Sequence, residues 1–229
     1  MEEIPIITID GLSGSGKGTI SKMLCFELDW NILDSGALYR TLAYLIELRA
    51  IDIEDFGAYK KELQEEFQVT FGIGSLGEPV NIFLKGQDIT DQVRTERIAE
   101  KTSELSSLKE IRDFVTPHQR EFKKLPGLIA DGRDMGTVIF PEANLKIYLT
   151  ASLQERAKRR ESQLKRLGSK VNMPLLLEEL EARDSKDIER ELSPLIPAED
   201  SYEIDTTGLS PEEVLNKIRN LSSDFRFGV

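Results

Sequence analysis

The sequence predicts an α/β fold in which a parallel sheet is wrapped by helices. Short apolar runs rich in β-branched residues recur along the chain, and each ends in a turn of polar residues or glycine. Segments with the periodicity of amphipathic helices lie between most of these runs. Strands that alternate with helices in this way pair in parallel and are covered by the helices.

Five runs are expected to form the sheet, because each is short, apolar and bounded by turn residues. The first, residues 4–9, reads IPIITI and is followed by Asp10 and Gly11. The other strands are expected at residues 31–33, 128–130, 145–149 and 202–204. Helices are expected at residues 16–28, 37–49, 152–167, 173–192 and 210–221.

One stretch interrupts the alternation of strands and helices. Residues 67–71, 80–84 and 87–90 have the pattern of strands, with only turn residues between them. Strands joined so directly pair antiparallel, which predicts a small meander inserted in the α/β body. Two helices, at residues 93–102 and 105–122, are expected to lead back to the main sheet.

Composition narrows the class of protein. The chain has 229 residues, 39% apolar and 31% charged, which suits one α/β domain with an elaboration. Its single cysteine, Cys25, excludes a disulfide framework and a cysteine-based zinc site. The net charge of −11 argues against nucleic acid as a partner, since nucleic-acid binders carry a basic footprint. No signal peptide or membrane-spanning run is recognisable, so a cytoplasmic protein without a membrane partner is expected.

The most specific motif is IDGLSGSGKGT, residues 9–19, between the first strand and the first helix. It matches the phosphate loop G-x-x-x-x-G-K, in which glycines let backbone N–H groups approach phosphate oxygens and Lys17 reaches the β- and γ-phosphates. The usual next residue is Ser or Thr, but here it is Gly18, so Thr19 is left as a candidate for contact with a metal ion. The residues expected to bind the triphosphate are Gly11, Ser13, Gly14, Ser15, Gly16, Lys17, Gly18 and Thr19.

Phosphate loops serve guanine-nucleotide switches, ATPase motors and small-molecule kinases alike. A switch would carry the base-reading motif N-K-x-D, but residues 216–219 read NKIR and fail it. Four further groups of residues could bind a second anion, as a kinase with a phosphorylated acceptor requires. Each group also has a plain structural interpretation, and their presence together with the phosphate loop favours the kinase.

Two of these groups follow expected strands. In DSGALYR, residues 34–40, Ser35 is placed to cap a helix and Arg40 lies one turn into that helix. The segment can be an anion-binding site at the helix N-terminus, or an ordinary helix cap followed by a surface arginine. In LIADGRDMG, residues 128–136, Asp131 closes a strand as a magnesium-ordering carboxylate would, and Arg133 lies in the following loop. A plain turn is the alternative there.

The other two groups lie on expected helices. Arg183, Asp187 and Arg190 are spaced to share one face, on which Arg183 can pair with Asp187 and leave Arg190 for an anion. Arg156 and Arg160 form a like-charged pair that is unfavourable unless an anion lies between them. Solvent-exposed charged faces are the alternative for both groups.

Phosphoryl transfer accounts for this inventory of residues. Catalysis of that reaction is mainly alignment and charge neutralisation by lysine, arginine and magnesium. A phosphate acceptor is already ionised at neutral pH, so no strong general base is required. The single histidine, His118, and Cys25 are accordingly expected to be structural.

Taken in order, these motifs resemble those of the bacterial cytidylate kinase family. The resemblance rests on the phosphate loop with its GKGT ending, DSGALYR, the inserted meander, PGLIADGRDMGT and ARDSKDIER, and it covers residues 4–221. It implies transfer of the γ-phosphate of ATP to CMP or dCMP, with magnesium. It also implies a five-stranded parallel core of the phosphate-loop NTPase type, an acceptor-binding region enlarged by the insert and a short mobile lid.

The resemblance further implies a role for each matching residue. The groups expected to hold the CMP phosphate are Ser35, Arg40, Arg133 and Arg190. Those expected to read the cytosine are Ser103, Arg112 and Asp134, and those for the sugar are Arg183 and Asp187. Arg156 and Arg160 are expected in the lid over the ATP phosphates, so the catalytic set is Lys17, Arg133, Arg156, Arg160 and Arg190. Magnesium is expected near Thr19 and Asp131.

One position departs from the family pattern. Lys186 stands where the family often has another arginine, and a lysine keeps the charge but loses the planar fork. Kinases for UMP, AMP or a non-nucleotide acceptor stay open as alternatives, as does a non-catalytic regulator that closes on ATP.

The expected organisation is a single kinase domain, residues 1–221, that is monomeric and binds only small molecules. Its core is residues 1–36 and 124–221, its acceptor-binding region is about 37–123 with the insert at 67–90, and its lid is about 155–172. Residues 222–229 are expected to form a tail.

Overall fold

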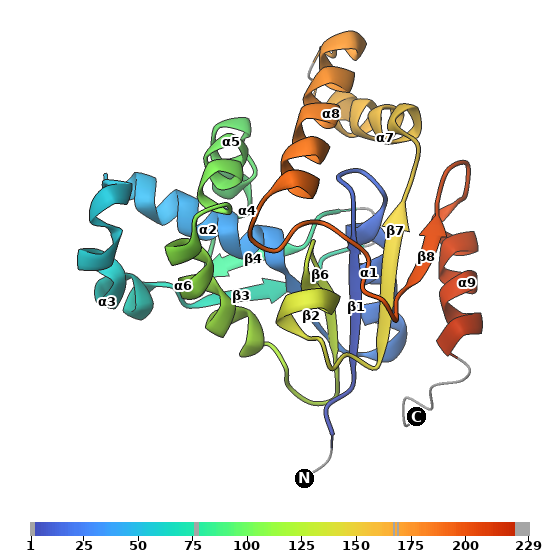
Figure 1. The fold of residues 1–229 in the computed structure, drawn as a ribbon, viewed down its shortest axis with the longest axis horizontal. Helices are drawn as coiled ribbons and strands as arrows, with labels where there is room; N and C mark the ends of the chain where they lie inside the picture. The colour runs from blue at the N-terminus through green and yellow to red at the C-terminus, as the bar shows by residue number, and fades with distance from the viewer. Residues whose placement is uncertain (1–2, 76–77, 167, 169, 223–229) are drawn as a thin grey trace.

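The computed structural model describes residues 3–75, 78–166, 168 and 170–222 (Figure 1). Within them five strands form one parallel sheet in the order β2-β6-β1-β7-β8. The bounds are β1 (Ile6–Gly11), β2 (Asn31–Asp34), β6 (Leu128–Asp131), β7 (Leu145–Thr150) and β8 (Tyr202–Asp205). The predicted α/β class and its five-stranded parallel sheet are therefore confirmed.

The central strand β1 lies between β6 and β7 and is buried along its whole length. Its alternating side chains supply two cores, because neighbouring residues of a strand point to opposite faces. Ile6 packs in the core on the α2 side, whereas Ile7 and Ile9 pack in the core on the α1 and α9 side. The three strand ends that matter for function meet at one edge, where Asp131 is in register with both Ile9 and Asp34.

Helices surround this sheet (Figure 1). Helix α1 (Lys17–Leu28) packs against β6 and α9 (Pro211–Ser222), and α2 (Ser35–Leu48) packs against α5 and α6. Helices α7 (Leu153–Arg166) and α8 (Met173–Glu189) pack against each other and rise from the end of the sheet where β7 ends. None of the helices in the described residues is long and apolar enough to cross a membrane.

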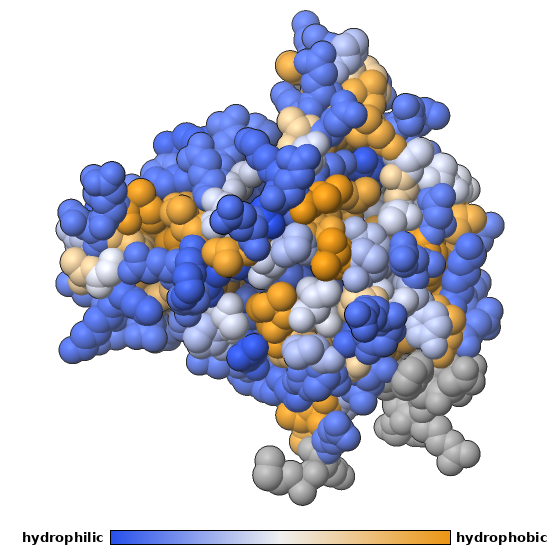
Figure 2. Space-filling view, viewed as in Figure 1, coloured by the Kyte–Doolittle hydropathy of each residue, from blue (hydrophilic) through white to orange (hydrophobic). Residues whose placement is uncertain are grey.

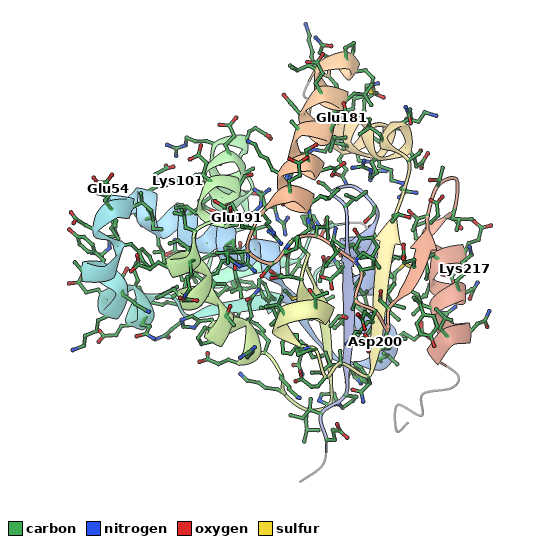
Figure 3. The ribbon with its side chains drawn as sticks, in the orientation of Figure 1. Glu54, Lys101, Glu181, Glu191, Asp200 and Lys217 are labelled. Atoms are coloured by element: carbon green, nitrogen blue, oxygen red, sulfur yellow. The ribbon has the colours of Figure 1, made fainter. Side chains whose placement is uncertain are left out.

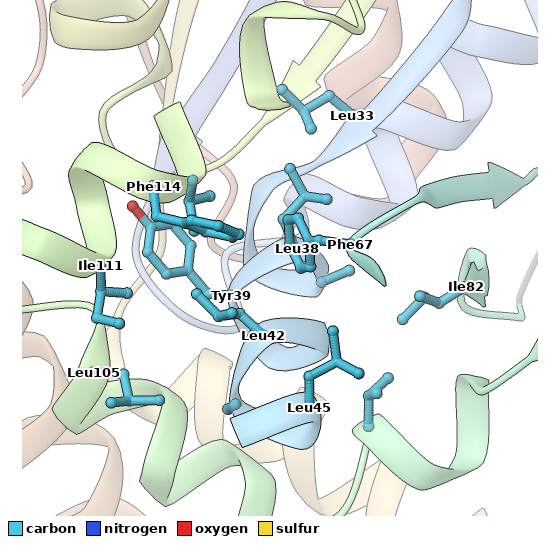
Figure 4. Close-up of a cluster of buried hydrophobic side chains, with 14 of the residues drawn as sticks. Leu33, Leu38, Tyr39, Leu42, Leu45, Phe67, Ile82, Leu105, Ile111 and Phe114 are labelled. Carbon is cyan, nitrogen blue, oxygen red and sulfur yellow. The ribbon is translucent and has the colours of Figure 1, made fainter. Parts of the chain in front are cut away.

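The segment between β2 and β6 carries the predicted insert. It comprises the short helix η1 (Ile53–Asp55), α3 (Phe56–Glu66), then β3 (Val69–Gly72), β4 (Asn81–Leu84) and β5 (Gln87–Asp88), which form the expected antiparallel sheet. Helices α4 (Thr90–Val93), α5 (Glu96–Leu105) and α6 (Lys109–Arg120) follow. Figure 4 shows the core that α2 shares with these elements, in which Tyr39, Leu42 and Phe114 lie close together with Ile111 and Leu105 beside them.

Some predicted boundaries are wrong. The helix expected at 93–102 is divided into α4 and α5, because Thr95 is extended and its hydroxyl caps α5 by accepting from the Ile98 N–H at 3.3 Å. Helix α8 ends at Glu189 rather than 192, and Pro194 disfavours helical backbone just beyond it. The pattern predicts nothing for residues 50–66, where η1 and α3 lie. Residues 223–229 of the expected tail lie outside the described residues.

Candidate active site

The phosphate loop joins β1 to α1 in a backbone conformation that requires glycine. Gly11, Gly14 and Gly16 all have positive φ, and a Cβ on Gly11 would lie 2.0 Å from the carbonyl oxygen of Leu149. Gly16 is the N-cap of α1, and no side chain of the described residues caps that helix. The N–H groups of its first turn are therefore left for an anion, which the helix dipole favours.

Lys17 lies folded back over this loop. Its Nζ donates to the carbonyl oxygen of Leu12 at 2.9 Å, and the side chain is buried. Burial lowers the pKa of Lys17, and the neighbouring Arg133 lowers it further, against the opposing charges of Asp131 and Asp10. A polyanion bound in the loop would favour the charged ammonium group.

Asp10, for which no role is predicted from the sequence, holds the loop that follows β6. Its two carboxylate oxygens accept from the N–H groups of Met135 at 2.9 Å and Gly136 at 2.8 Å. Burial raises the pKa of Asp10 to about 6, although those two hydrogen bonds act in the other direction. These bonds fix the start of the short π-helix η2 (Met135–Ile139) and hence the direction of the adjacent Arg133 and Asp134.

The residues predicted for magnesium lie around the start of α1. The Thr19 hydroxyl is in an exposed part of the first turn, and the Ser21 hydroxyl donates to Asp131 Oδ2 at 3.4 Å. A Cβ on Gly18 would lie 3.6 Å from the same Asp131 oxygen, so the glycine leaves space beside the carboxylate. Desolvation raises the pKa of Asp131, which a bound cation would counter.

Among the described residues no group of three or more His, Cys, Asp or Glu side chains could hold a metal ion. The hydroxyl of Thr19 and the carboxylate of Asp131 fit Mg²⁺, because this ion usually keeps several waters and binds one or two carboxylates together with substrate phosphates.

Asp134 forms a buried ion pair with Arg112, which comes from α6. Arg112 also donates to the Ser106 carbonyl oxygen at 3.2 Å, and its guanidinium carbon lies 5.9 Å from the centre of the Tyr39 ring. Burial raises the pKa of Tyr39 to about 12, and its hydroxyl has no hydrogen-bond partner among the described residues. The arrangement presents a carboxylate, a guanidinium and a phenol in one enclosed region.

A cavity of about 320 Å³ lies between α5 and the lower part of α8. The predicted Ser103 lies on this cavity, and so does Lys186. Residues that line it are Ser103, Glu104, Ser106, Ser107, Lys186, Asp187, Glu189 and Arg190.

The predicted pairing of Arg183 with Asp187 is wrong. Asp187 accepts instead from Arg133 Nε at 2.9 Å and lies 3.9 Å from Arg190 Nη1, while no ion pair of the described residues joins it to Arg183. Burial would raise the pKa of Asp187, but the guanidinium groups of Arg133, Arg190 and Arg183 hold it below its ordinary value. Tertiary packing sets the partner of Asp187, because the loop after β6 brings Arg133 against α8.

Arg190 does not continue the helical face as predicted. It is the C-cap of α8 with extended backbone, and its Nε donates to the Ser193 carbonyl oxygen. Its Nη2 is buried and has no hydrogen-bond partner among the described residues. A buried donor without a partner is costly, so this atom is suited to an anion.

At the start of α2 the cap is Asp34 and not Ser35 as predicted. Asp34 Oδ1 accepts from the Ala37 N–H at 2.9 Å, since an extended residue before the helix is better placed to cap it. Ser35 is the first helical residue, and its hydroxyl accepts from Gln119 Nε2 at 2.9 Å. One turn on, Arg40 donates to the Val93 carbonyl oxygen at 3.1 Å. Burial and the nearby Arg183 lower the pKa of Arg40 to about 10.

Arg156 and Arg160 each have a carboxylate partner, so their like charges are offset in the ligand-free protein without an anion between them. Arg156 is buried and lies 2.6 Å from Asp184 Oδ2, and it donates to the Ser13 carbonyl oxygen at 3.2 Å. Arg160 is more exposed and lies 3.6 Å from Glu96 Oε2 on α5.

The sequence analysis also misses Arg159. This residue donates to the carbonyl oxygens of Ser15 at 3.1 Å and Thr206 at 2.7 Å, tying α7 to the phosphate loop and to the end of β8. No sequence motif predicts that Arg159 contacts the phosphate loop. The one local feature is Glu155, four residues earlier, which pairs with Arg159 at 3.0 Å.

Comparison with known proteins gives a consistent family. The family model described as cytidylate kinase matches residues 7–224. The cytidylate kinase of Stutzerimonas stutzeri is 47% identical over 224 residues, covering 98% of this chain and 97% of its own, and that of Pseudomonas fluorescens is 48% identical over 214 residues, covering 93% of each. The solved structure of shikimate kinase from Acinetobacter baumannii in complex with shikimate has a TM-score of 0.42 at 16% identity, covering 97% of this chain and 95% of that one.

Proposed function

The chain belongs to the cytidylate kinase family, and on that premise we propose that it transfers the γ-phosphate of ATP to CMP and to dCMP. The observation that carries the choice of acceptor is the buried Asp134–Arg112 pair beside Arg133. Cytosine has an exocyclic amine that needs an acceptor and ring acceptors that need a donor. The Asp134 carboxylate paired with the Arg112 guanidinium offers both an acceptor and a donor.

The donor end of the reaction rests on the phosphate loop. Its glycines leave backbone N–H groups accessible, and the ammonium group of Lys17 lies over the loop. In this proposal ATP binds with its β- and γ-phosphates on those N–H groups and draws Lys17 away from the Leu12 carbonyl oxygen. Lys17 then neutralises charge on the oxygens of the transferring phosphoryl group.

The acceptor end rests on groups from several elements. The CMP phosphate is held by Ser35, Arg40, Arg133 and Arg190, of which Arg190 has the buried unpartnered donor. Ser103, Arg112 and Asp134 bind the base, and Arg183 and Asp187 bind the sugar. Burial, and after it repulsion from neighbouring arginines, lowers the pKa of Arg40 and Arg183 in the ligand-free protein, and a phosphate bound among these groups would offset the repulsion.

The chemical step needs alignment more than proton transfer. An oxygen of the CMP phosphate forms a bond to the γ-phosphorus while the bond from that phosphorus to the β–γ bridging oxygen breaks, giving CDP and ADP. The attacking oxygen is already ionised, so no general base is required. Thr19 and Asp131 would hold Mg²⁺, which would supply charge neutralisation to the transferring phosphoryl group. Arg133, Arg156, Arg160 and Arg190 share that neutralisation.

The test is a coupled assay of ADP release with CMP, dCMP, UMP, AMP and GMP as acceptors, each at several concentrations. We expect kcat/KM for CMP to exceed that for UMP by at least tenfold, with turnover of dCMP as well. Equal values for UMP and CMP would overturn the base selectivity. Absence of turnover with every acceptor would overturn the kinase assignment and favour a regulator.

The protein is further proposed to be a single domain with a lid and an acceptor-binding region. We place the lid at about residues 155–172 and the acceptor-binding region at about 37–123, within one domain. The protein is proposed to act as a monomer in the cytoplasm on small nucleotides, in keeping with its acidic composition. The face seen in Figure 2 is largely hydrophilic, as a net charge of −11 leads one to expect.

A further inference from the structure

A buried ion pair connects the phosphate loop with helix α8. Arg156 and Asp184 have only 5% and 11% of their side chains exposed, and Arg156 Nη1 lies 2.6 Å from Asp184 Oδ2. The same Nη1 donates to the Ser13 carbonyl oxygen at 3.2 Å, while Nε donates to the Ala151 carbonyl oxygen at 3.0 Å. One guanidinium group thus holds the phosphate loop, the start of α7 and α8 together.

The contact between the loop and Arg156 is close. A Cβ on Gly14 would lie 3.1 Å from Arg156 Cβ, so the loop backbone rests directly on the first turn of α7. The second oxygen of Asp184, Oδ1, is buried and has no hydrogen-bond partner among the described residues. Burial raises the pKa of Asp184 despite the charge of Arg156.

Asp184 also lies near Asp187, one of the residues proposed to bind the acceptor nucleotide. It lies three residues before Asp187, so the two side chains are neighbours on α8. Asp187 in turn accepts from Arg133 at 2.9 Å. Contacts therefore run without interruption from the Ser13 carbonyl oxygen through Arg156, Asp184 and one turn of α8 to Asp187 and Arg133.

We infer that Asp184 is a positioning residue that couples occupancy of the phosphate loop to the affinity for the acceptor nucleotide. The inference rests on the proposed function, because it requires ATP in the loop and CMP near Asp187. An anion in the loop attracts the Arg156 guanidinium and draws it away from the Ser13 carbonyl oxygen. Asp184 follows Arg156, since a buried carboxylate left without its cation is costly, and α8 moves with it. By reciprocity, CMP must tighten ATP binding by the same factor.

The test is calorimetric. The dissociation constant of CMP is measured with and without a saturating non-hydrolysable ATP analogue, and the ratio of the two constants is the coupling factor. For the wild type we expect a factor of about five or more, the lower end of common allosteric coupling. Asp184→Asn keeps the shape but removes the charge, and we expect a factor within twofold of one. The matched control is Glu181→Gln, because Glu181 is an exposed residue in the middle of the same helix (Figure 3), and it should keep the wild-type factor.

A coupling factor near one in the wild type, or an unchanged factor in Asp184→Asn, would overturn the inference. Should Asp184→Asn fail to fold, the double variant Asp184→Asn with Arg156→Gln replaces the ion pair by a neutral hydrogen-bonding pair and leaves no buried charge unpaired. The same loss of coupling is expected there, and retained coupling would contradict it. Absence of CMP binding by the wild type would overturn the proposed function itself, which the acceptor assay reports separately.

Discussion

The two halves of the site are built in different ways. The proposed donor half is one continuous segment, residues 11–19, which offers mainly backbone N–H groups held by glycine conformation. The proposed acceptor half collects side chains from α2, α5, α6, the loop after β6 and the end of α8, which are far apart in the sequence. A site formed by the backbone of one segment can therefore be recognised as a sequence motif. A site formed by side chains from several elements cannot, because the packing of those elements sets the positions of the side chains.

The two halves also differ in how their charges are balanced before substrate binds. The donor half holds Lys17 with its pKa lowered by burial and bonded to a neutral carbonyl group. The acceptor half holds its arginines in pairs, as Arg133 with Asp187 and Arg112 with Asp134. Loss of the lysine should therefore act on the chemical step, and loss of an acceptor carboxylate on selectivity and stability.

The largest effect is expected for Lys17→Ala. Removing the ammonium group takes away charge stabilisation that matters most in the transition state, so kcat should fall by roughly 10²- to 10³-fold. Steady-state kinetics with ATP and CMP measure it, and Lys217→Ala on the exposed side of α9 is the control (Figure 3). A loss confined to KM would contradict the proposed role.

A smaller effect, on selectivity, is expected for Asp134→Asn. The cytosine amine loses its charged acceptor and Arg112 loses its buried partner, so kcat/KM for CMP should fall by about 10²-fold. The ratio of kcat/KM for CMP to that for UMP should fall at least tenfold. Asp113→Asn, an exposed position on α6, is the matched control. An unchanged ratio would show that Asp134 does not read the base.

Asp187→Ala should distinguish ribose from deoxyribose. If the carboxylate accepts from the 2′-hydroxyl, its loss costs CMP about tenfold more in kcat/KM than it costs dCMP, because one hydrogen bond to a charged group is worth roughly 1.5 kcal/mol or more. The release of Arg133 affects both substrates and cancels in the comparison. Equal penalties for the two acceptors would count against a sugar contact.

The smallest effect concerns stability and pH. The native pKa of Asp187 is below its ordinary value of 3.8, so the native carboxylate contributes stability that is fully present above that value and is lost as pH falls through the native pKa. Asp187→Asn should therefore lower the unfolding free energy by about 1 kcal/mol at pH 7. In urea unfolding series the difference from the wild type should vanish at strongly acidic pH. A difference that persists there would show that packing, not charge, is responsible.

Much of this fold could be predicted from local sequence. Residues 128–130 lie within a buried strand because they are apolar and followed by a turn, and the meander at residues 67–90 was recognisable from strands with nothing but turns between them. Helix α3 escaped prediction because few of its residues are buried, with Phe56 and Leu63 alone among its described side chains in the core. Its helical pattern is therefore weak.

The site shows the same division. The residues of the phosphate loop are predicted from spacing alone, and Arg133, Asp134 and Asp187 are proposed as site residues from the motifs around them. The partners of those residues could not. Asp10, Gln119 and Asp184 are ordinary in the sequence, and their roles arise from contacts with Met135, Ser35 and Arg156.

Local sequence is enough to identify the phosphate loop and most of the strands and helices along the chain, because glycine conformation and hydrophobic periodicity act over a few neighbouring residues. Only the tertiary structure decided which carboxylate each arginine faces. Asp187 was expected to pair with Arg183 on its own helix, yet it pairs with Arg133 from the β6 loop, and Asp184 pairs with Arg156 from α7. Charge pairing depends on distance in space, and the packing of elements far apart in the chain sets that distance.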